Sequence, residues 1–198
     1  MGASSTGLLL ILSAPSGAGK LTLLREVRQE HPGLCTTISA TTRQPRPGEI
    51  DGRDYYFLAR EDFEARRDRG EFAEWAEVHA NLYGTLKCEL QRCLAENRVV
   101  ILELDVQGMR SMRQEFPEAV TVFIMPPSIE ELDRRLRGRG DTDEADIALR
   151  LSNARLEMDA ANEFDYVVIN DEVKRAARDL GAILTAEHCR SHRVLQLT

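Results

Sequence analysis

Four short apolar runs of strand length recur along the chain, each bounded by polar or turn-forming residues. Successive positions within each run are apolar, which is typical of strands buried on both faces of a parallel sheet. The runs cover residues 8–12, 99–104, 120–125 and 166–169. Together they predict the strands of one buried sheet.

Segments that we interpret as helices lie between and after these runs, at residues 21–30, 107–115, 129–137 and 173–188. Strands that alternate with helices favour a parallel sheet whose faces are covered by those helices. The pattern therefore predicts an α/β fold with a parallel sheet flanked by helices. A chain of 198 residues is long enough for one such compact unit with small insertions.

Two regions interrupt the alternation. Residues 39–83 hold the turn-rich PRPGEIDGRD, the aromatic DYYF and the carboxylate-bearing EFAEWAEV, and they predict a small β-rich insertion. Residues 134–151 place glycines at a helix end and offer Asp141 with Glu144 as a capping box for a new helix, which predicts a hinged flap. The apolar stripe on that new helix predicts a packing face and consists of Ile147, Leu151, Ala154 and Met158.

Composition and charge indicate the compartment and the kinds of partner to expect for such a protein. Hydrophobic residues at 42% and charged residues at 30% are ordinary for a soluble globular protein, and the net charge of −7 disfavours nonspecific nucleic-acid binding. No apolar stretch approaches the roughly 20 residues of a membrane span, and the first residues lack the basic start of a secretory signal. Four scattered cysteines predict reduced thiols. We expect a cytoplasmic protein without nucleic-acid or membrane partners, either a monomer or a homo-oligomer.

The stretch SAPSGAGK joins the first predicted strand to the first predicted helix. Backbone N–H groups of such a turn and of the helix N-terminus can surround a phosphate, with Lys20 reaching the terminal phosphates. The full pattern has Gly where this chain has Ala14, and Ser or Thr where it has Leu21. The strand–loop–helix setting favours a phosphate-binding loop over a simple turn, but Leu21 removes a hydroxyl that such loops use for Mg²⁺.

The segment ILELDVQG delivers Glu103 and Asp105 to the carboxyl edge of the predicted sheet, where α/β proteins bind ligands. These carboxylates could bind an acceptor hydroxyl, or hold Mg²⁺ directly or through water. In the alternative interpretation, Asp105 only caps the helix that begins near Gln107.

These motifs also follow a family order. SAPSGAGK, SATTRQPRPGEIDGRDYYF, EFAEWAEVHANLYGT, ILELDVQG, RRLRGRG and VINDE have the order and spacing of guanylate kinases, so the chain from about Leu8 to Arg190 resembles that family. The resemblance implies ATP-dependent phosphorylation of GMP, and of dGMP, by a P-loop NTPase-like fold. It also implies a single domain over residues 1–198, with a core at 7–38, 84–134 and 163–198, a GMP-binding insertion at 39–83 and a lid at 135–162.

For the GMP phosphate, the resemblance implies contacts from Arg43, Arg46 and Tyr55. Two guanidiniums and a phenol can fork onto a phosphate dianion, a geometry that lysines reproduce poorly. Judged without the resemblance, this stretch is an exposed turn held by two prolines, followed by Tyr55 and Tyr56 as strand-packing residues.

For the guanine base, the resemblance implies Ser39, Glu74 and Thr85, with Tyr83 nearby. Guanine offers N1–H and N2–H groups that one carboxylate can accept together, whereas adenine lacks this paired donor edge. We therefore expect Glu74 to select guanine, although without the resemblance it would be an exposed strand carboxylate. The expected GMP contacts also include the carboxylates of the second motif, Glu103 and Asp105.

For ATP and the transferred phosphoryl group, the resemblance implies lid contacts from Arg135, Arg139 and Arg150. Several guanidiniums suit the dispersed charge of phosphoryl transfer, whereas Arg134 and Arg137 need only face solvent. The resemblance also implies an ATP contact from Asn170, which follows the last predicted strand. In the alternative interpretation, Asn170 lies in a plain turn at the strand end. The expected ATP contacts are Ala14, Pro15, Ser16, Gly17, Ala18, Gly19, Lys20, Leu21, Thr22 and Asn170.

The expected mechanism is in-line transfer of the ATP γ-phosphoryl group to a GMP phosphate oxygen. Lys20, Arg43, Asp105 and the three lid arginines are the expected catalytic groups, with Mg²⁺ held by Asp105 directly or through water. Two alternatives stay open. One is a GMP-binding or protein-interaction domain whose phosphotransfer is weakened by Leu21, and the other is a kinase for a different nucleoside monophosphate.

Overall fold

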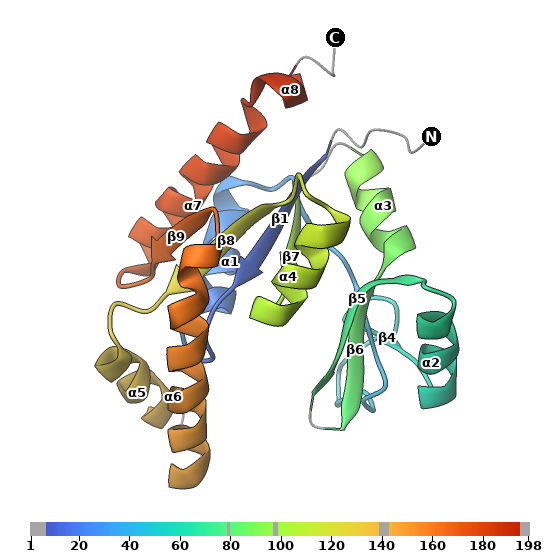
Figure 1. Cartoon of the computed structure of the whole chain (residues 1–198), viewed down its shortest axis with the longest axis horizontal. Helices are drawn as coiled ribbons and strands as arrows, with labels where there is room; N and C mark the ends of the chain where they lie inside the picture. The colour runs from blue at the N-terminus through green and yellow to red at the C-terminus, as the bar shows by residue number, and fades with distance from the viewer. Residues whose placement is uncertain (1–6, 79, 97–98, 139–142, 195–198) are drawn as a thin grey trace.

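The computed structural model describes residues 7–78, 80–96, 99–138 and 143–194, and it contains a large parallel sheet (Figure 1). The strands of this sheet are β1 (Leu8–Ser13), β2 (Leu34–Thr36), β7 (Val99–Glu103), β8 (Val120–Met125) and β9 (Tyr166–Ile169). Their order is β2-β7-β1-β8-β9, and every neighbouring pair is parallel. All six residues of β1 are buried, because both faces of the sheet are covered.

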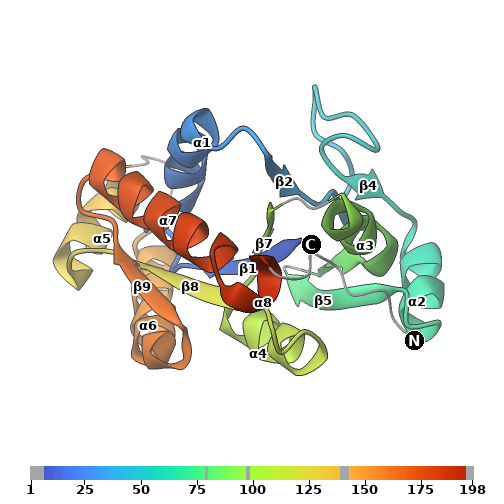
Figure 2. The ribbon, with the colours of Figure 1, turned by 90° about the horizontal axis from the view of Figure 1, so that it is seen from above.

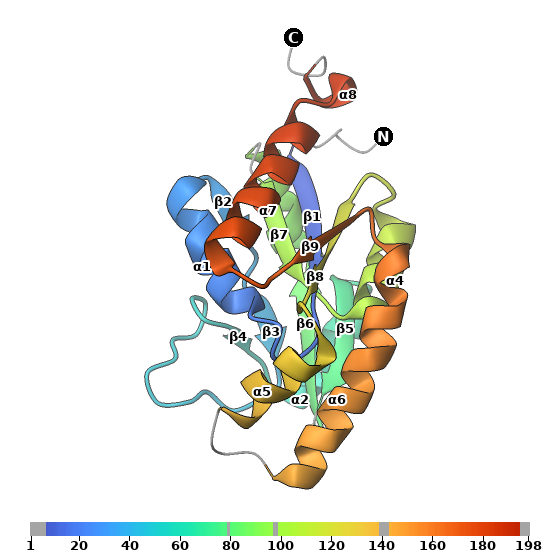
Figure 3. The ribbon, with the colours of Figure 1, turned by 90° about the vertical axis from the view of Figure 1, so that its left-hand side faces the viewer.

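Helices cover the two faces of the large sheet, as Figures 2 and 3 show for α7 on one side and α4 on the other. These helices are α1 (Lys20–Glu30), α3 (Lys87–Ala95), α4 (Val106–Glu115) and α7 (Val173–His188). Leu8 and Leu10 of β1 belong to one apolar cluster with residues of α1 and α7. Leu9 and Ile11 belong to the opposite cluster, with residues of α3 and α4. The uninterrupted apolar run of β1 therefore serves two cores.

A second, smaller sheet is built from residues that follow β2. Its elements are β3 (Ser39–Thr41), β4 (Tyr56–Phe57), α2 (Arg60–Asp68), β5 (Phe72–Val78) and β6 (Asn81–Leu86). The strand order is β4-β3-β6-β5, with β3 parallel to β4 and antiparallel to β6. Phe63 of α2 stacks on Phe72 with ring centroids 4.2 Å apart. This small sheet therefore has its own apolar core.

Two further helices pack together beside the end of the large sheet, α5 (Ile129–Arg137) and α6 (Glu144–Asp159). Ser128 caps α5, because its Oγ accepts a hydrogen bond from the Glu131 amide at 3.2 Å. Asp143 precedes α6 without a side-chain cap bond, and Asp141 of the expected capping box lies outside the described residues. The expected packing stripe of α6 is confirmed, since its four members are buried or packed against apolar clusters.

The predicted α/β fold with a parallel sheet flanked by helices is confirmed. The four predicted strands and four predicted helices occur within one residue of their expected ends. Sequence patterns did not predict β2, α2 or α3. The remaining elements are η1 (Ala160–Glu163) and α8 (Ser191–Val194).

Two other observations concern expectations from composition. Cys35, Cys88, Cys93 and Cys189 are all free thiols. Among the described residues, no helix is both long and apolar enough to cross a membrane.

Candidate active site

The glycine-rich loop lies between the end of β1 and the start of α1, as the sequence predicted. Gly17 and Gly19 have φ angles of +93° and +86°, a left-handed region that favours glycine. The Ala18 amide donates to the Pro15 carbonyl at 3.0 Å, which closes the turn. Because α1 begins at Lys20, the free N–H groups of its first turn adjoin this loop. The arrangement suits an anion, since these N–H groups and the helix dipole both favour negative charge.

Helix α5 packs against the outside of this loop. A Cβ added to Gly17 would lie 2.9 Å from Leu136 Cδ2 and 3.0 Å from Leu132 Cδ1. Both leucines are buried in the cluster shared by α5 and α6. Gly17 is therefore required for the close approach of the helix as well as for the turn.

Asn170 and Arg135 also converge on the loop, as the resemblance led us to expect for two ATP contacts. Asn170 Nδ2 donates to the Ala18 carbonyl at 2.7 Å, and Arg135 Nη1 lies 3.5 Å from the same oxygen. Arg135 Nη2 donates to the Asn170 carbonyl at 3.1 Å, while its Nε donates to Glu131 at 2.8 Å. A guanidinium is thus already placed beside the phosphate loop.

Lys20 and the carboxylates of the second motif form a charged group at the carboxyl end of β1 and β7. Lys20 Nζ lies 3.4 Å from Glu103 Oε2. Asp105 caps α4, because its Oδ1 accepts from the Gly108 amide at 2.7 Å. The expected cap at the start of α4 is therefore present, and Asp105 is exposed.

Leu21 and Thr22 both lie in the first turn of α1 and are exposed. The Leu21 side chain is 64% exposed, a high value for a leucine, and it packs in none of the apolar clusters. Its apolar character therefore contributes little to the core.

Strand pairing in the small sheet brings the three expected guanine contacts side by side. Ser39 of β3 is opposite Thr85 of β6, which is opposite Glu74 of β5. Thr85 Oγ1 donates to Glu74 Oε1 at 2.8 Å. Gly84 permits this packing, since a Cβ there would lie 2.8 Å from the Glu74 carbonyl oxygen.

Glu74 is half-buried rather than the exposed strand carboxylate that its sequence alone suggested. Burial raises the pKa of Glu74, the hydrogen bond from Thr85 opposes that rise, and the charge of Asp105 adds to it. A carboxylate that has lost part of its hydration in this way is stabilised by a ligand that donates two N–H hydrogen bonds to it.

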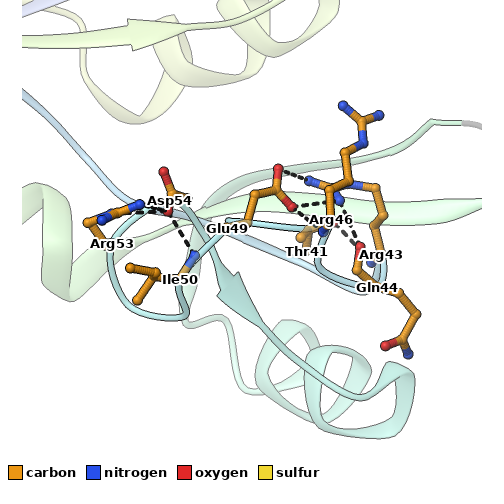
Figure 4. A network of polar contacts seen from close by, with 8 residues as sticks. All are labelled: Thr41, Arg43, Gln44, Arg46, Glu49, Ile50, Arg53 and Asp54. Atoms are coloured by element: carbon orange, nitrogen blue, oxygen red, sulfur yellow. Dashed lines mark hydrogen bonds and ion pairs between the residues drawn. The ribbon is translucent and has the colours of Figure 1, made fainter.

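Arg43 lies in the turn after β3 and is held by a carboxylate that the sequence analysis did not single out, Glu49 (Figure 4). Both terminal nitrogens of Arg43 donate to Glu49 at 2.9 Å, and Nη1 also donates to the Gln44 carbonyl at 2.7 Å. Hydrogen bonds from the Arg43 side chain and the Arg46 amide hold the pKa of Glu49 below its usual value. Glu49 therefore orients the guanidinium in the turn.

Aromatic rings support the same guanidinium. Arg43 Cζ lies 5.3 Å from the Tyr55 ring centroid and 5.7 Å from that of Phe57. Tyr55 meets Tyr83 edge to face at 6.3 Å. The guanidinium of Arg46 extends away from Glu49 into solvent (Figure 4). Arg43, Tyr55 and Tyr83 are thus brought together, whereas Arg46 is not.

The other two expected lid arginines are Arg150 and Arg139. Arg150 pairs with Asp146 of its own helix at 2.8 Å, and Arg139 lies outside the described residues. Arg134 and Arg137 form surface ion pairs on α5, in agreement with the solvent-facing role expected for them.

Two acidic residues at the candidate site were missed by the sequence analysis, Glu49 and Glu157. Glu157 of α6 lines a cavity of about 320 Å³ together with Asp105. Burial and the charge of Asp105 raise the pKa of Glu157, whereas Lys20 lowers it. Its helix lies far along the chain from both motifs, so no local pattern marked it. Glu49 could have been found, because it follows Arg43 by six residues within one turn.

A parallel sheet with a glycine-rich loop and a lysine between its central strand and the next helix defines a P-loop nucleotide-binding protein. The family model described as Guanylate kinase matches residues 6–187. The chain belongs to the guanylate kinase family.

Individual relatives agree with this assignment. The chain is 50% identical to a guanylate kinase of Aromatoleum aromaticum, over 93% of this chain and 90% of that protein. It is 45% identical to a guanylate kinase of Geobacter metallireducens, over 96% and 94% of the two chains. The crystal structure of guanylate kinase from Anaplasma phagocytophilum matches with a TM-score of 0.73 and 34% identity, covering 96% of this chain and 90% of that one.

Proposed function

We propose that the chain transfers the γ-phosphoryl group of ATP to GMP, and also to dGMP, and thereby acts in purine nucleotide metabolism. Family membership makes it an enzyme, a nucleoside monophosphate kinase. The observation that carries the substrate proposal is the register that aligns Ser39, Thr85 and Glu74 in the small sheet. We further propose the cytoplasm as its compartment.

Guanine selection rests on Glu74 in its ionised form. The carboxylate would accept the N1–H and N2–H groups of guanine together, while Thr85 holds one of its oxygens. An adenine base would leave the half-buried carboxylate without these two donors, a penalty that can exceed 10³-fold in a site built for them. Ser39 and Tyr83 complete the proposed base pocket.

The GMP phosphate would be bound by Arg43, Arg46 and Tyr55. The bidentate pair of Arg43 with Glu49 supports this role, because a phosphate offers two oxygens in the same fork geometry. The exposed Arg46 guanidinium would have to turn toward the phosphate when GMP binds. Glu103 and Asp105 would contact GMP from the loop side.

The donor would lie on the glycine-rich loop, where backbone N–H groups and Lys20 stabilise the charge of the phosphates. Arg135 is already beside the loop, whereas Arg150 would have to leave Asp146 to reach the transferred group. Arg139 is proposed as the third lid arginine. We propose Asn170 as an ATP contact as well.

The carboxylates near Lys20 fit a magnesium ion, because oxygen atoms are the ligands that Mg²⁺ prefers. Asp105, directly or through water, is the proposed ligand, with Glu103 beside it. No group of three or more His, Cys, Asp or Glu side chains suited to a metal occurs in the described ranges, so phosphates and water would complete the shell. When bound, Mg²⁺ neutralises charge on the phosphate oxygens.

Transfer would proceed in line, without a covalent enzyme intermediate. The GMP phosphate oxygen attacks the γ-phosphorus as the bond to the ADP oxygen breaks, and the arginines and Lys20 stabilise the charge. We propose that an insertion at residues 39–83 and a lid at 135–162 close over a core at 7–38, 84–134 and 163–198. Closure would exclude water as a competing acceptor.

A coupled assay of ADP production tests this function with GMP, dGMP, AMP, CMP and UMP as acceptors. We expect rapid ADP formation with GMP and dGMP only. Rapid turnover with AMP but not GMP would overturn the substrate proposal. Tight GMP binding with negligible ADP formation would instead favour the weakened binding domain.

A further inference from the structure

Asn170 is a buried polar residue whose contacts concern the loop backbone. It directly follows edge strand β9, yet its side chain reaches across the sheet end to the loop after β1. Only 1% of Asn170 is exposed, and its Nδ2 donates to the Ala18 carbonyl at 2.7 Å. Its Oδ1 is buried and has no hydrogen-bond partner within the described ranges. Burial of an unpaired amide oxygen costs free energy. The hydrogen bond from Nδ2 to the Ala18 carbonyl is therefore kept despite a cost to stability, which indicates a role beyond stability.

The geometry of the Ala18–Gly19 peptide bond indicates what that role is. The Ala18 carbonyl and the Gly19 N–H belong to the same trans peptide plane and therefore point in opposite directions. A donor that holds the carbonyl outward keeps the N–H directed toward the interior of the loop. The absence of a Cβ at Gly19 makes this approach possible, since a Cβ would lie 2.7 Å from Asn170 Nδ2.

Arg135 joins the same peptide to helix α5. Its Nη1 lies 3.5 Å from the Ala18 carbonyl, and its Nη2 donates to the Asn170 carbonyl at 3.1 Å. Glu131 fixes the guanidinium from the other side through Nε at 2.8 Å. The loop, the end of β9 and α5 therefore meet at one carbonyl oxygen.

We propose that Asn170 is a positioning residue that holds the Ala18–Gly19 peptide with its N–H directed toward the ATP phosphates. Arg135 completes this clamp on the carbonyl side. The inference rests on the proposed function and deepens it, because it assigns Asn170 to the triphosphate end of the ATP site. Its effect on ATP passes through the loop backbone.

Inorganic tripolyphosphate with Mg²⁺ is the decisive probe, because it carries the phosphates without an adenine base. We expect Asn170→Ala, measured by calorimetry, to weaken tripolyphosphate and ATP binding by a similar factor of about tenfold, as loss of one buried hydrogen bond implies. Asn170→Asp keeps the size but removes the donor and adds negative charge, so binding should weaken further. GMP affinity should stay within about twofold, because the clamp lies on the donor loop.

Asn162→Ala serves as the control, because Asn162 is an exposed asparagine outside the site. Asn170→Ser keeps a short donor and should recover part of the affinity, and it replaces the Asp variant if that variant does not fold. The Gly19 amide resonance should shift in Asn170→Ala and stay unchanged in Asn162→Ala. Unchanged tripolyphosphate affinity in both Asn170→Ala and Asn170→Asp would overturn the inference. Wild-type protein that fails to phosphorylate GMP would instead overturn the proposed function.

Discussion

The phosphate loop and the small sheet build their candidate sites from different materials. The loop offers backbone N–H groups within one contiguous stretch, and packing from Leu136 and Asn170 fixes its shape. The small sheet offers side chains from separate strands and a turn, which strand register and ion pairs bring together. A small change in backbone shape should therefore damage the loop, whereas a change in one side-chain group should damage the sheet.

This difference also predicts which substrate each region affects. Phosphates are recognised by charge and N–H direction, which the loop supplies for any nucleoside triphosphate. A base is recognised by the pattern of its donors and acceptors, which only side chains of fixed type can match. We expect loop variants to alter ATP parameters and sheet variants to alter GMP parameters.

Glu74→Gln should have the largest effect. The neutral amide replaces one acceptor by a donor, which faces the guanine N–H groups and leaves them poorly paired. We expect kcat/KM for GMP to fall by about 10²–10⁴-fold, with the KM for ATP nearly unchanged. Steady-state kinetics with each substrate varied in turn measure the split. Equal losses for ATP and GMP would contradict the division between the two regions.

The same variant should gain stability at neutral pH. Because burial raises the pKa of Glu74 in the folded protein, ionisation costs more there than in the unfolded chain. Stability from this group is present at pH below its ordinary value and is lost as pH rises through the raised folded pKa. Glu74→Gln should therefore have the higher Tm at pH 7, with the gap closing at acidic pH. In the wild type, KM for GMP should rise on acidification as the carboxylate becomes protonated.

Gly19→Ala tests the opposite kind of damage, to backbone shape. The new methyl would meet Asn170 Nδ2 at 2.7 Å, and alanine resists a φ of +86°. We expect kcat/KM for ATP to fall by about 10–100-fold from this strain, while GMP affinity is kept. Gly33→Ala is the matched control, because no atom lies within 4 Å of a Cβ there. An unaffected Gly19→Ala enzyme would show that loop shape is more tolerant than its packing suggests.

Most of the large sheet was predictable from the sequence, because its three inner strands β1, β7 and β8 are buried on both faces. An uninterrupted apolar run such as that of β1 has few other structures available. Strand β2 has only three residues, and helix α2 buries only one side chain, so neither carries a clear apolar pattern. Their structure depends on tertiary packing, as the stacking of Phe63 on Phe72 illustrates.

The phosphate loop and the site in the small sheet also differ in how far the sequence predicts them. The loop could be recognised locally, because its glycines and Lys20 are contiguous. The alignment of Glu74 with Thr85 could be expected only through resemblance, since pairing register is not written in either strand alone. The orientations of the Arg46 and Arg150 side chains could not be predicted from the sequence. An exposed guanidinium turns toward whichever carboxylate lies near it in space, as Arg150 does toward Asp146.

Glu49→Gln tests how the ion pair between Arg43 and Glu49 affects GMP binding at the small sheet. Glutamine keeps an oxygen for the Arg46 amide but removes the charge that engages Arg43. The phosphate of GMP then meets one fewer competing anion, so KM for GMP should fall by about two- to fivefold, within the range of exposed ion pairs. The effect should persist to mildly acidic pH, because Arg43 holds the pKa of Glu49 below its usual value. Glu64→Gln on α2 is the control, and a raised KM would mean that Glu49 serves chiefly to orient Arg43.

Leu21→Ser should have the smallest effect and concerns the loop position that lacks the usual hydroxyl. The serine hydroxyl can join the oxygen ligands of Mg²⁺, which Leu21 cannot supply. Because Leu21 is 64% exposed, its replacement removes little core packing. We expect kcat/KM for ATP to rise by roughly twofold and to depend more steeply on Mg²⁺, with GMP affinity unchanged. Leu149→Ser, another exposed leucine, controls for lost apolar surface. Equal or lower activity in Leu21→Ser would mean that backbone N–H groups and Lys20 suffice without this hydroxyl.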